Sequence, residues 1–382
     1  MECKVSPCSP CCLLSHCPSS RFRWVFCQLE MLRLCIRSRV RNFVNALPDG
    51  LDETYERVLK GIPKTNRHHV QRVLQCLAIA FRPLRVEELA QILSFDPDGI
   101  EEVAIVNPNS PLEDQEQELL SACPSLITVV DSLGSRVVHF SHFSVKEFLM
   151  SGRLSTSGED ISHYHILPDV AHTTIAQTSL GVLLRLDDLV DRWSAENTLA
   201  AYAAEHWVSH VQVANTSSHI MRMMEILFDL ERPHFATWIR IYDIDERMWN
   251  PDRDTAMPLY YAALCGFCDL VENLVKKNPG HVNTLGGIHD YPLVAALHRG
   301  HIQFANLLLQ HGANLDERGT YDRTPLHHAI TRLDETVVGA VRFLLEHGAD
   351  PNPQQSDLRT PLHLAAAWGN DKVTQILLQT RV

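Results

Sequence analysis

The chain has 382 residues, which predicts two or three domains, and its composition of 45% hydrophobic and 21% charged residues is typical of a globular protein. A formal net charge of −12 argues against an extended nucleic-acid-binding surface. No apolar run reaches the ~20 residues needed to span a bilayer. Five of the eleven cysteines lie in the first 17 residues and the rest are scattered singly, which favours a reducing, cytoplasmic location.

The first 21 residues are rich in Cys, Ser and Pro, and we expect them to form a disordered leader. Zinc binding by Cys8, Cys11 and Cys17 is an alternative, although their spacing fits no regular ligand pattern, and palmitoylation is another. Residues 21–46 are predicted to form one helix with an apolar stripe. Its many arginines leave a mitochondrial transit segment open as an alternative.

Residues 47–96 predict three helices separated by Pro63 and Pro83. The first begins at Asp49 or Asp52, since aspartate can cap a helix N-terminus. The second and third have apolar residues at helical spacing, which are Val70, Val73, Leu74, Leu77 and Phe81 in the second and Val86, Leu89 and Leu93 in the third.

A helix at 112–123 is followed by two β-branched runs at 125–142, which flank a turn and predict a hairpin, and by a further helix at 143–151. Helices followed by a hairpin are typical of a winged-helix domain, here 63–155. The helix that would read DNA carries only acidic charges, Glu113, Asp114, Glu116 and Glu118, so DNA binding is disfavoured. His139 and His142 lack a third metal ligand and are expected to be structural.

Residues 156–250 are predicted to form a helical spacer, with helices in 199–211 and 227–245. Beyond it, Pro258, Pro292, Pro325 and Pro361 recur at spacings of 34, 33 and 36 residues, which indicates stacked helix pairs. Thr324 and Thr360 precede two of these prolines and can cap the helix, while proline suits the first helical position. Gly300 and Gly369 are expected to end first helices, and Gly312 and Gly348 to end second helices in the left-handed conformation.

The segment 254–382 resembles ankyrin repeats, with four units in the domain 251–382. The first unit is degenerate, since Met257 and Tyr260 stand where the pattern has Thr and His, and the last is expected to be truncated. The resemblance implies an α-solenoid that binds a protein partner through the concave ends of its first helices and its loop tips. The partner-binding positions it implies are Leu264, Ile288, Asp290, His298, Arg299, Tyr321, Arg323, Thr331, Arg332, Asp357, Arg359 and Trp368.

Four of these positions are arginines, Arg299, Arg323, Arg332 and Arg359, and would line one side of the array. Arginine pairs with carboxylates in a two-point fashion, and aromatic residues dominate binding hot spots. The sequence therefore predicts a preference for an acidic peptide or segment, with Tyr321 and Trp368 as aromatic anchors.

The stretches "LPDGLDETYERVLKGIP", "RPLRVEELAQIL" and "VVHFSHFSVKEFLMS" resemble the winged-helix module of the GPI inositol-deacylase type in fungal NACHT-type STAND (NLR-like) proteins. In that family the order is effector, NACHT NTPase, winged helix, helical spacer and repeats. The resemblance implies that 22–62 corresponds to the end of the NTPase region. It also implies contact between the winged helix and an NTPase domain that is missing from this chain.

A nucleotide-hydrolysing domain requires a phosphate loop, and no Gly-Lys dipeptide occurs in the chain. We therefore expect no enzyme activity and no catalytic, cofactor or metal site. The predicted protein is mainly α-helical, with a winged-helix module that carries one β-hairpin, a helical spacer and an ankyrin-repeat solenoid. Its expected function is that of a protein-interaction scaffold or sensor fragment of a STAND-type signalling protein. The alternatives are a degenerate nucleotide-binding NTPase fragment and a winged-helix DNA-binding regulator.

Overall fold

The computed structural model describes residues 24–25, 28–29, 50–95, 111–123, 125–132, 134–186, 198–214, 217–245, 257–331 and 336–380. The predictions for the Cys-rich leader and for Arg332 lie outside the described residues, as does most of the helix predicted at 21–46. The chain divides into two compact units. Unit 1 is Met1–Thr178 with Ser209–Asn215, and unit 2 is Ser179–Val208 with Thr216–Val382.

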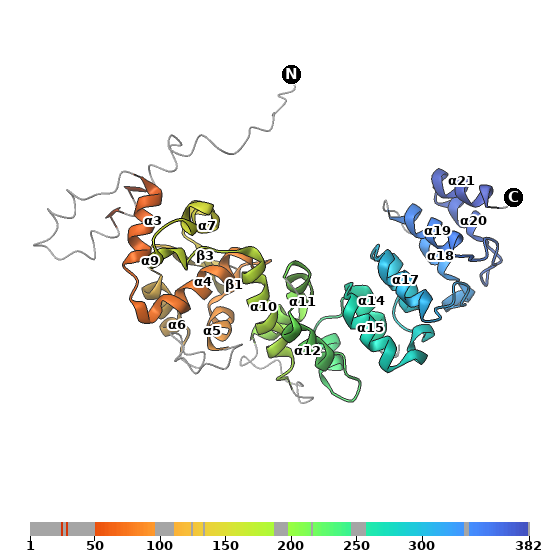
Figure 1. Ribbon diagram of the computed structural model, residues 1–382, viewed down its shortest axis with the longest axis horizontal. Helices are drawn as coiled ribbons and strands as arrows, with labels where there is room; N and C mark the ends of the chain where they lie inside the picture. Colours follow the sequence, from red (N-terminus) through yellow and green to blue (C-terminus); the bar gives the residue numbers. More distant parts are fainter. Residues whose placement is uncertain are drawn as a thin grey trace, which may run out of the picture. The chain divides into compact units, whose positions relative to one another are not determined.

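Unit 1 contains short helices and a three-stranded antiparallel sheet (Figure 1). Its elements are α3 (Leu51–Lys60), η2 (Lys64–Asn66), α4 (Arg67–Ile79), β1 (Leu84–Arg85), α5 (Val86–Ser94), α6 (Leu112–Ala122), β2 (Ile127–Ser132), β3 (Ser135–Phe140), α7 (Phe143–Met150), α8 (Gly152–Ser155) and α9 (Glu159–Ser162). The sheet order is β1-β3-β2. The predicted hairpin is confirmed, in a register that runs from Ile127 opposite Phe140 to Ser132 opposite Ser135.

Three details of unit 1 differ from the predictions. Helix α3 begins after Gly50, which makes no side-chain cap, so neither Asp49 nor Asp52 is the cap residue. Phe81 lies beyond the end of α4 and is 50% exposed, because the backbone turns extended ahead of Pro83. Strand β1 was not predicted, since two residues are too few to show an alternating pattern.

An ion pair between Arg82 and Glu88 ties the segment before α5 to its first turn. The two nitrogens of the guanidinium lie 2.8 and 2.6 Å from the carboxylate of Glu88, which is 1% exposed and also accepts from the Arg85 backbone N–H at 2.9 Å. We expect Arg82→Ala to lower the free energy of unfolding by about 2–4 kcal/mol, because it leaves a buried carboxylate without its cation.

The matched control is Arg153→Ala, which removes an exposed ion pair with Asp52 at 2.9 Å and should cost under ~1 kcal/mol. Urea denaturation followed by circular dichroism measures both variants. Similar losses in the two would show that burial of Glu88 does not decide the effect.

Helices α10 (Pro168–Leu183) and α11 (Thr198–Val213) each contain residues of both units. The remaining elements of unit 2 are α12 (Ser218–Leu227), α13 (His234–Ile241), α14 (Pro258–Cys265), α15 (Cys268–Lys277), η4 (Pro279–Asn283), α16 (Pro292–His298), α17 (Ile302–Gln310), η5 (Thr320–Asp322), α18 (Pro325–Ile330), α19 (Val337–Glu346), α20 (Pro361–Ala367) and α21 (Asp371–Gln379). The spacer helix predicted in 199–211 corresponds to α11, whereas 227–245 holds only the shorter α13.

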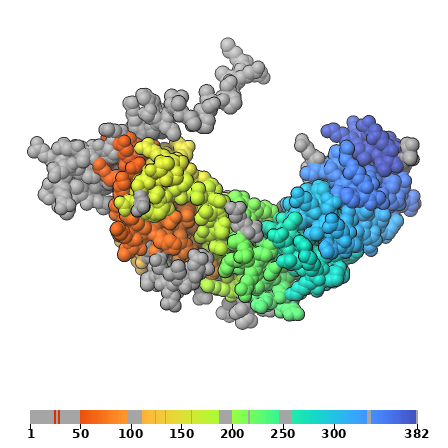
Figure 2. All heavy atoms as spheres, viewed as in Figure 1, coloured from red at the N-terminus to blue at the C-terminus, as the bar shows by residue number. Residues whose placement is uncertain are grey.

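Helices α14 to α21 form four successive helix pairs, which we call repeats one to four. Neighbouring first helices contact one another along the array, as α14 does α16, α16 does α18 and α18 does α20. In the space-filling view the repeats follow each other without a break, from teal to dark blue (Figure 2). This stacking buries a continuous apolar seam, which is how repeats that cannot form a core alone become stable.

The local signals at the helix ends are mostly confirmed. Each first helix has proline at its start. Gly300, Gly312, Gly348 and Gly369 all have positive φ, between 65° and 94°. A proline supplies the fixed φ that a first turn needs, and glycine adopts the left-handed stop without strain.

The predicted threonine caps of α18 and α20 are confirmed, and in each a histidine completes a capping box. The threonine side chain accepts from the backbone N–H of the third helical residue, and the histidine side chain at that position accepts from the threonine backbone N–H. In repeat three the Thr324 backbone N–H donates to His327 Nδ1 at 3.2 Å, and the Thr324 hydroxyl lies 3.0 Å from the same nitrogen. His327 Nε2 lies 3.2 Å from the carbonyl oxygen of Arg359 in the next repeat. One imidazole therefore caps its own helix and links two repeats.

Aromatic side chains form the core between the spacer helices and repeat one. Trp207 and Trp238 are fully buried with ring centroids 5.2 Å apart, and Phe228 lies 5.6 Å from Trp238. The Trp238 indole N–H donates to the Ala204 carbonyl at 3.0 Å. These spacer residues are therefore packed as part of unit 2. In the described part of the chain no helix combines the length and apolar character that crossing a bilayer requires.

Candidate functional site

A hollow of about 240 Å³ lies between the first helices of repeats two and three, and we call it the His–Arg hollow. Its lining residues are Ile288, His289, Val294, Leu297, His298, Arg323, Pro325, His328, Ala329, Thr331 and Ala340. Helices α16 and α18 supply its walls, and the loops that precede them supply its rim. The lining combines apolar side chains with three imidazoles and one guanidinium, which is the mixture expected of a binding site rather than of a packed core.

Two of the imidazoles stack against each other. The rings of His289 and His298 have centroids 3.7 Å apart at an interplanar angle of 30°. Behind them the buried Asp245 carboxylate lies 3.9 Å from His289 Nε2, and it accepts from the Tyr260 hydroxyl at 2.7 Å and from the Ile288 backbone N–H at 2.7 Å. The stacked pair is therefore held in place by a carboxylate that does not line the hollow.

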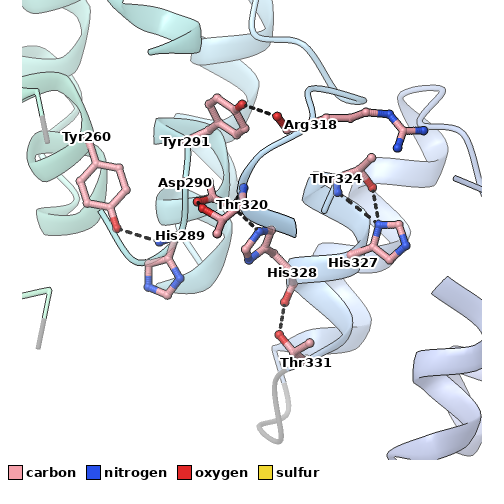
Figure 3. A network of polar contacts seen from close by, with 10 residues as sticks. All are labelled: Tyr260, His289, Asp290, Tyr291, Arg318, Thr320, Thr324, His327, His328 and Thr331. Carbon is pink, nitrogen blue, oxygen red and sulfur yellow. Dashed lines mark hydrogen bonds and ion pairs between the residues drawn. The ribbon is translucent and has the colours of Figure 1, made fainter. Parts of the chain in front are cut away.

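The third imidazole has a similar support one repeat further along. His328 Nε2 lies 2.9 Å from Oδ2 of Asp290, and Thr320 donates to the same carboxylate through its backbone N–H at 2.9 Å and its hydroxyl at 2.6 Å (Figure 3). Burial by itself would raise the pKa of Asp290, but the hydrogen bonds from His328 and Thr320 outweigh it and hold that pKa below its ordinary value. Asp290 is therefore a charged anchor inside the repeat array.

Arg323 stands at the rim beside Tyr321. Its guanidinium carbon lies 5.5 Å from the centre of the Tyr321 ring, which is 69% exposed. Arg323 Nε is buried and has no hydrogen-bond acceptor within the residues that the structure describes. This arginine thus has unused donor capacity next to an exposed aromatic ring.

The loop before α16 depends on Gly287 because Tyr260 crosses directly over it. Gly287 has a φ of +73°, and a Cβ at this position would clash with Cζ of the Tyr260 ring. The Tyr260 hydroxyl in turn accepts from the His289 backbone N–H at 3.2 Å, as Figure 3 shows. Close approach at Gly287 therefore sets the position of the rim that carries Ile288 and His289.

We expect Gly287→Ala to lower the free energy of unfolding by about 2–4 kcal/mol. Alanine would be strained at this positive φ, and its Cβ would clash with the Tyr260 ring. The control is Gly312→Ala, which has a φ of +89° and open space around its Cβ, so that it carries only the strain of about 1 kcal/mol. Thermal denaturation of both variants gives the difference. Equal losses would mean that contact with Tyr260 adds nothing.

The structure brings together four of the sequence-predicted partner-binding residues, because Ile288, His298, Arg323 and Thr331 all line the His–Arg hollow. Tyr321 adjoins it through Arg323. Trp368 is half-exposed at the end of α20, in repeat four, and does not line the hollow.

Other predicted residues have different surroundings. Leu264 and Asp290 are 3% and 1% exposed, so neither presents its side chain to a partner, and both predictions are corrected. Leu264 faces the seam between repeats, and Asp290 turns inward to bind Thr320 and His328. Arg299 is exposed and donates to the Ile244 carbonyl at 3.2 Å. Asp357 and Arg359 pair with each other at 3.3 Å on the surface of repeat four.

Sequence reasoning missed His289 and His328 as parts of this site. One signal for His328 was available. His328 is the third residue after the proline that begins α18, and the same position in the other repeats holds Tyr261, Ala295 and Leu364. A polar residue there departs from the pattern. No comparable signal existed for His289, whose role depends on its stacking with His298.

The side chains of this site can bind a ligand through charge, hydrogen bonds and apolar contact. Among the described residues no three His, Cys, Asp or Glu side chains are placed to hold a metal ion together. In unit 1, His142 Nδ1 accepts from the Ser144 backbone N–H at the start of α7, which is a structural role. Helix α6 carries Glu113 and Asp114 on its exposed face, and Glu116 is paired with Arg136 of β3.

Comparisons with known proteins agree with this division of the chain. A family model described as "GPI inositol-deacylase, winged helix domain" matches residues 55–158. Two models described as ankyrin repeats match residues 259–355 and 337–378. The matched regions correspond to the sheet and helices of unit 1 and to repeats one to four.

Two curated proteins are similar to parts of the chain. "Azaphilone pigments biosynthesis cluster protein L" of Monascus ruber is 30% identical over 302 residues, which cover 72% of this chain and 61% of that protein. "Ankyrin repeat protein nuc-2" of Neurospora crassa is 30% identical over 73 residues, which cover 19% of this chain and 7% of that protein. The chain thus spans only part of each relative's length. The family models therefore place a winged-helix domain of the GPI inositol-deacylase type ahead of ankyrin repeats in this chain.

Proposed function

We propose that this chain is a sensor or scaffold part of a STAND-type signalling protein and that it binds a protein partner through the first helices and loop tips of its repeats. Ankyrin repeats are protein-interaction domains, and winged-helix domains of this type are not catalytic. The observation that carries the proposal is the gathering of Ile288, His298, Arg323 and Thr331 around one hollow. On this proposal the winged helix of unit 1 contacts an NTPase domain and relays the binding event.

The proposed partner presents an acidic segment to this surface. Tyr321 and Trp368 are 69% and 50% exposed and supply large flat contact areas at low entropic cost. Arg323 adds a guanidinium beside the first of these rings. Aromatic and arginine side chains of this kind carry most of the free energy at protein interfaces.

The test uses the full chain as bait in a fungal extract, with chemical crosslinking to identify the partner and the site of contact. Changing Arg323 and Arg359 together to Glu should abolish the crosslinks to α16 and α18, because two favourable charges become repulsive. The control is Arg342→Glu, an exposed charge change on the second helix α19. Retention of every partner by the double variant would refute the proposal.

A nucleotide-binding role is the proposal's main competitor and is simple to measure. Fluorescent ATP should not bind the full chain with micromolar affinity, since no Gly-Lys phosphate loop is present. Saturable binding that Mg²⁺ strengthens would instead favour a degenerate NTPase.

A further inference from the structure

We propose that the His–Arg hollow receives a single carboxylate side chain, Glu or Asp, from the partner's acidic segment. We also propose that the histidines of the hollow take up protons when this side chain binds. The inference rests on the proposed function, because it names what the repeat surface grips. It goes further in assigning one subsite, one chemical group and a dependence on pH.

The charge distribution of the lining points to an anion. Arg323 and the three imidazoles line the hollow, and no carboxylate does so among the described residues. The buried Nε–H of Arg323 has no acceptor in the described part of the chain. A carboxylate in the hollow would accept from the guanidinium of Arg323 in the geometry that such groups favour.

Two carboxylates lie nearby, but they are turned away from the hollow. The side chains of Asp245 and Asp290 are 0% and 2% exposed, and donors within the array already occupy their oxygens. Each lies behind an imidazole, 3.9 Å from His289 and 2.9 Å from His328. Neither carboxylate therefore lines the hollow that the anion would enter.

The dimensions and walls of the hollow fit one amino-acid side chain. A volume of about 240 Å³ holds a carboxylate with its methylene groups, and Val294, Leu297 and Ala329 supply apolar contacts for the latter. A phosphoryl group carries up to two negative charges at neutral pH and would meet only one permanent cation, Arg323. The hollow therefore favours a carboxylate over a phosphorylated side chain.

The stacked imidazoles link binding to pH. The rings of His289 and His298 can lie 3.7 Å apart when both are neutral. An anion beside them would favour the protonated form of either ring, because opposite charges attract. An ordinary His titrates near pH 6.5 and an ordinary Glu near 4.3, so the ligand stays charged where the imidazoles gain protons. Affinity should therefore rise from about pH 8 to about pH 6. Asp245 and Tyr260 lie against His289, Arg323 and His328 line the same hollow, and Asp290 is paired with His328.

The experiment selects ligands without knowledge of the partner. Random peptides of about 12 residues, long enough to cross two repeats, are displayed on phage and panned against the immobilised full chain at about pH 6. Enriched peptides are expected to share an acidic position. A labelled copy is then titrated by fluorescence anisotropy at about pH 6 and pH 8, beside copies with Gln or phosphoserine at that position.

Three chain variants complete the experiment. Arg323→Gln should weaken the peptide about tenfold or more, which corresponds to the loss of one charge-assisted hydrogen bond. Arg342→Gln, with the same charge change on α19, should leave binding unchanged. His289→Gln combined with His298→Gln should remove most of the pH dependence and leave the circular dichroism spectrum intact.

The outcomes separate this inference from the function on which it rests. If peptides bind the repeats but lack a shared acidic position, tolerate Gln there or ignore Arg323→Gln, the carboxylate subsite is wrong and the proposed function stands. If the phosphoserine copy binds more tightly, the hollow is a phosphate site and the inference also fails. If no peptide is enriched, both the subsite and the proposed binding surface are overturned.

Discussion

Replacing Trp238 by alanine is expected to lower the free energy of unfolding of unit 2 by about 3–5 kcal/mol, the largest effect of any single change considered for this chain. The indole is fully buried among Trp207, Phe228 and Phe235, with ring centroids 5.2 to 6.0 Å away. Removing it opens a large cavity in the core that joins the spacer to repeat one. It also removes the hydrogen bond from the indole N–H to the Ala204 carbonyl.

Two further variants separate these contributions. Trp238→Phe keeps an aromatic ring but no N–H, so we expect a smaller loss of about 1–2 kcal/mol from the lost hydrogen bond to the Ala204 carbonyl and from imperfect packing. Trp368→Ala removes a half-exposed indole at the end of α20 and should stay within about 0.5 kcal/mol of the wild type. Urea denaturation followed by far-ultraviolet circular dichroism is suitable, because it does not depend on tryptophan emission. A Trp238→Ala loss no larger than that of Trp368→Ala would contradict the assigned core.

The second large effect is expected at Asp290. Asp290→Ala should cost about 2–4 kcal/mol, since it removes a buried carboxylate that accepts from Thr320 and lies 2.9 Å from His328 Nε2. Asp290→Asn keeps the shape but loses the charge, and an intermediate loss is expected. Differential scanning calorimetry of the full chain measures both variants.

The stability from Asp290 should also depend on pH in a defined direction. The pKa of Asp290 is lower in the folded chain than the ordinary value of about 3.9, so the folded state binds its proton less readily than the unfolded state. The contribution is therefore complete above about pH 4 and is lost as the pH falls through the depressed folded value. Wild type and Asp290→Asn should then converge in stability in acid.

The control for this measurement is Asp322→Asn, a change of an exposed carboxylate in η5. Its melting temperature should follow that of the wild type at every pH. If the difference in melting temperature between wild type and Asp290→Asn stayed constant as the pH fell below about 4, the charge of Asp290 would contribute nothing to stability.

Much of the fold was predictable because its signals are local. The prolines at 258, 292, 325 and 361 mark helix starts, and the glycines with positive φ mark helix stops, since backbone conformation alone fixes both roles. The hairpin of β2 and β3 was predictable from its β-branched runs and intervening turn. The threonine cap of α18 was predictable from the Thr-Pro-Leu-His motif, but the second hydrogen bond of the capping box, which His327 accepts, was not.

The candidate site was predicted less well. The partner-binding residues were predicted from their place in the repeat, and four of them line one hollow. Leu264 was assigned to the surface by the same reasoning, but the adjoining repeat covers it. Position within a repeat indicates which end of a helix a residue occupies, whereas its exposure depends on the neighbouring elements.

The sequence by itself determined the helix pairs, their order and their stacking, because proline, glycine and apolar spacing act within a few residues of one another. Only the tertiary structure decided that Asp290 is buried as a charged anchor, that His289 and His298 stack, and that Arg323 keeps an unused donor beside them. Each of these features needs side chains from two different loops or repeats at a distance of a few ångströms. Such distances follow from how the repeats pack, and no local pattern encodes them.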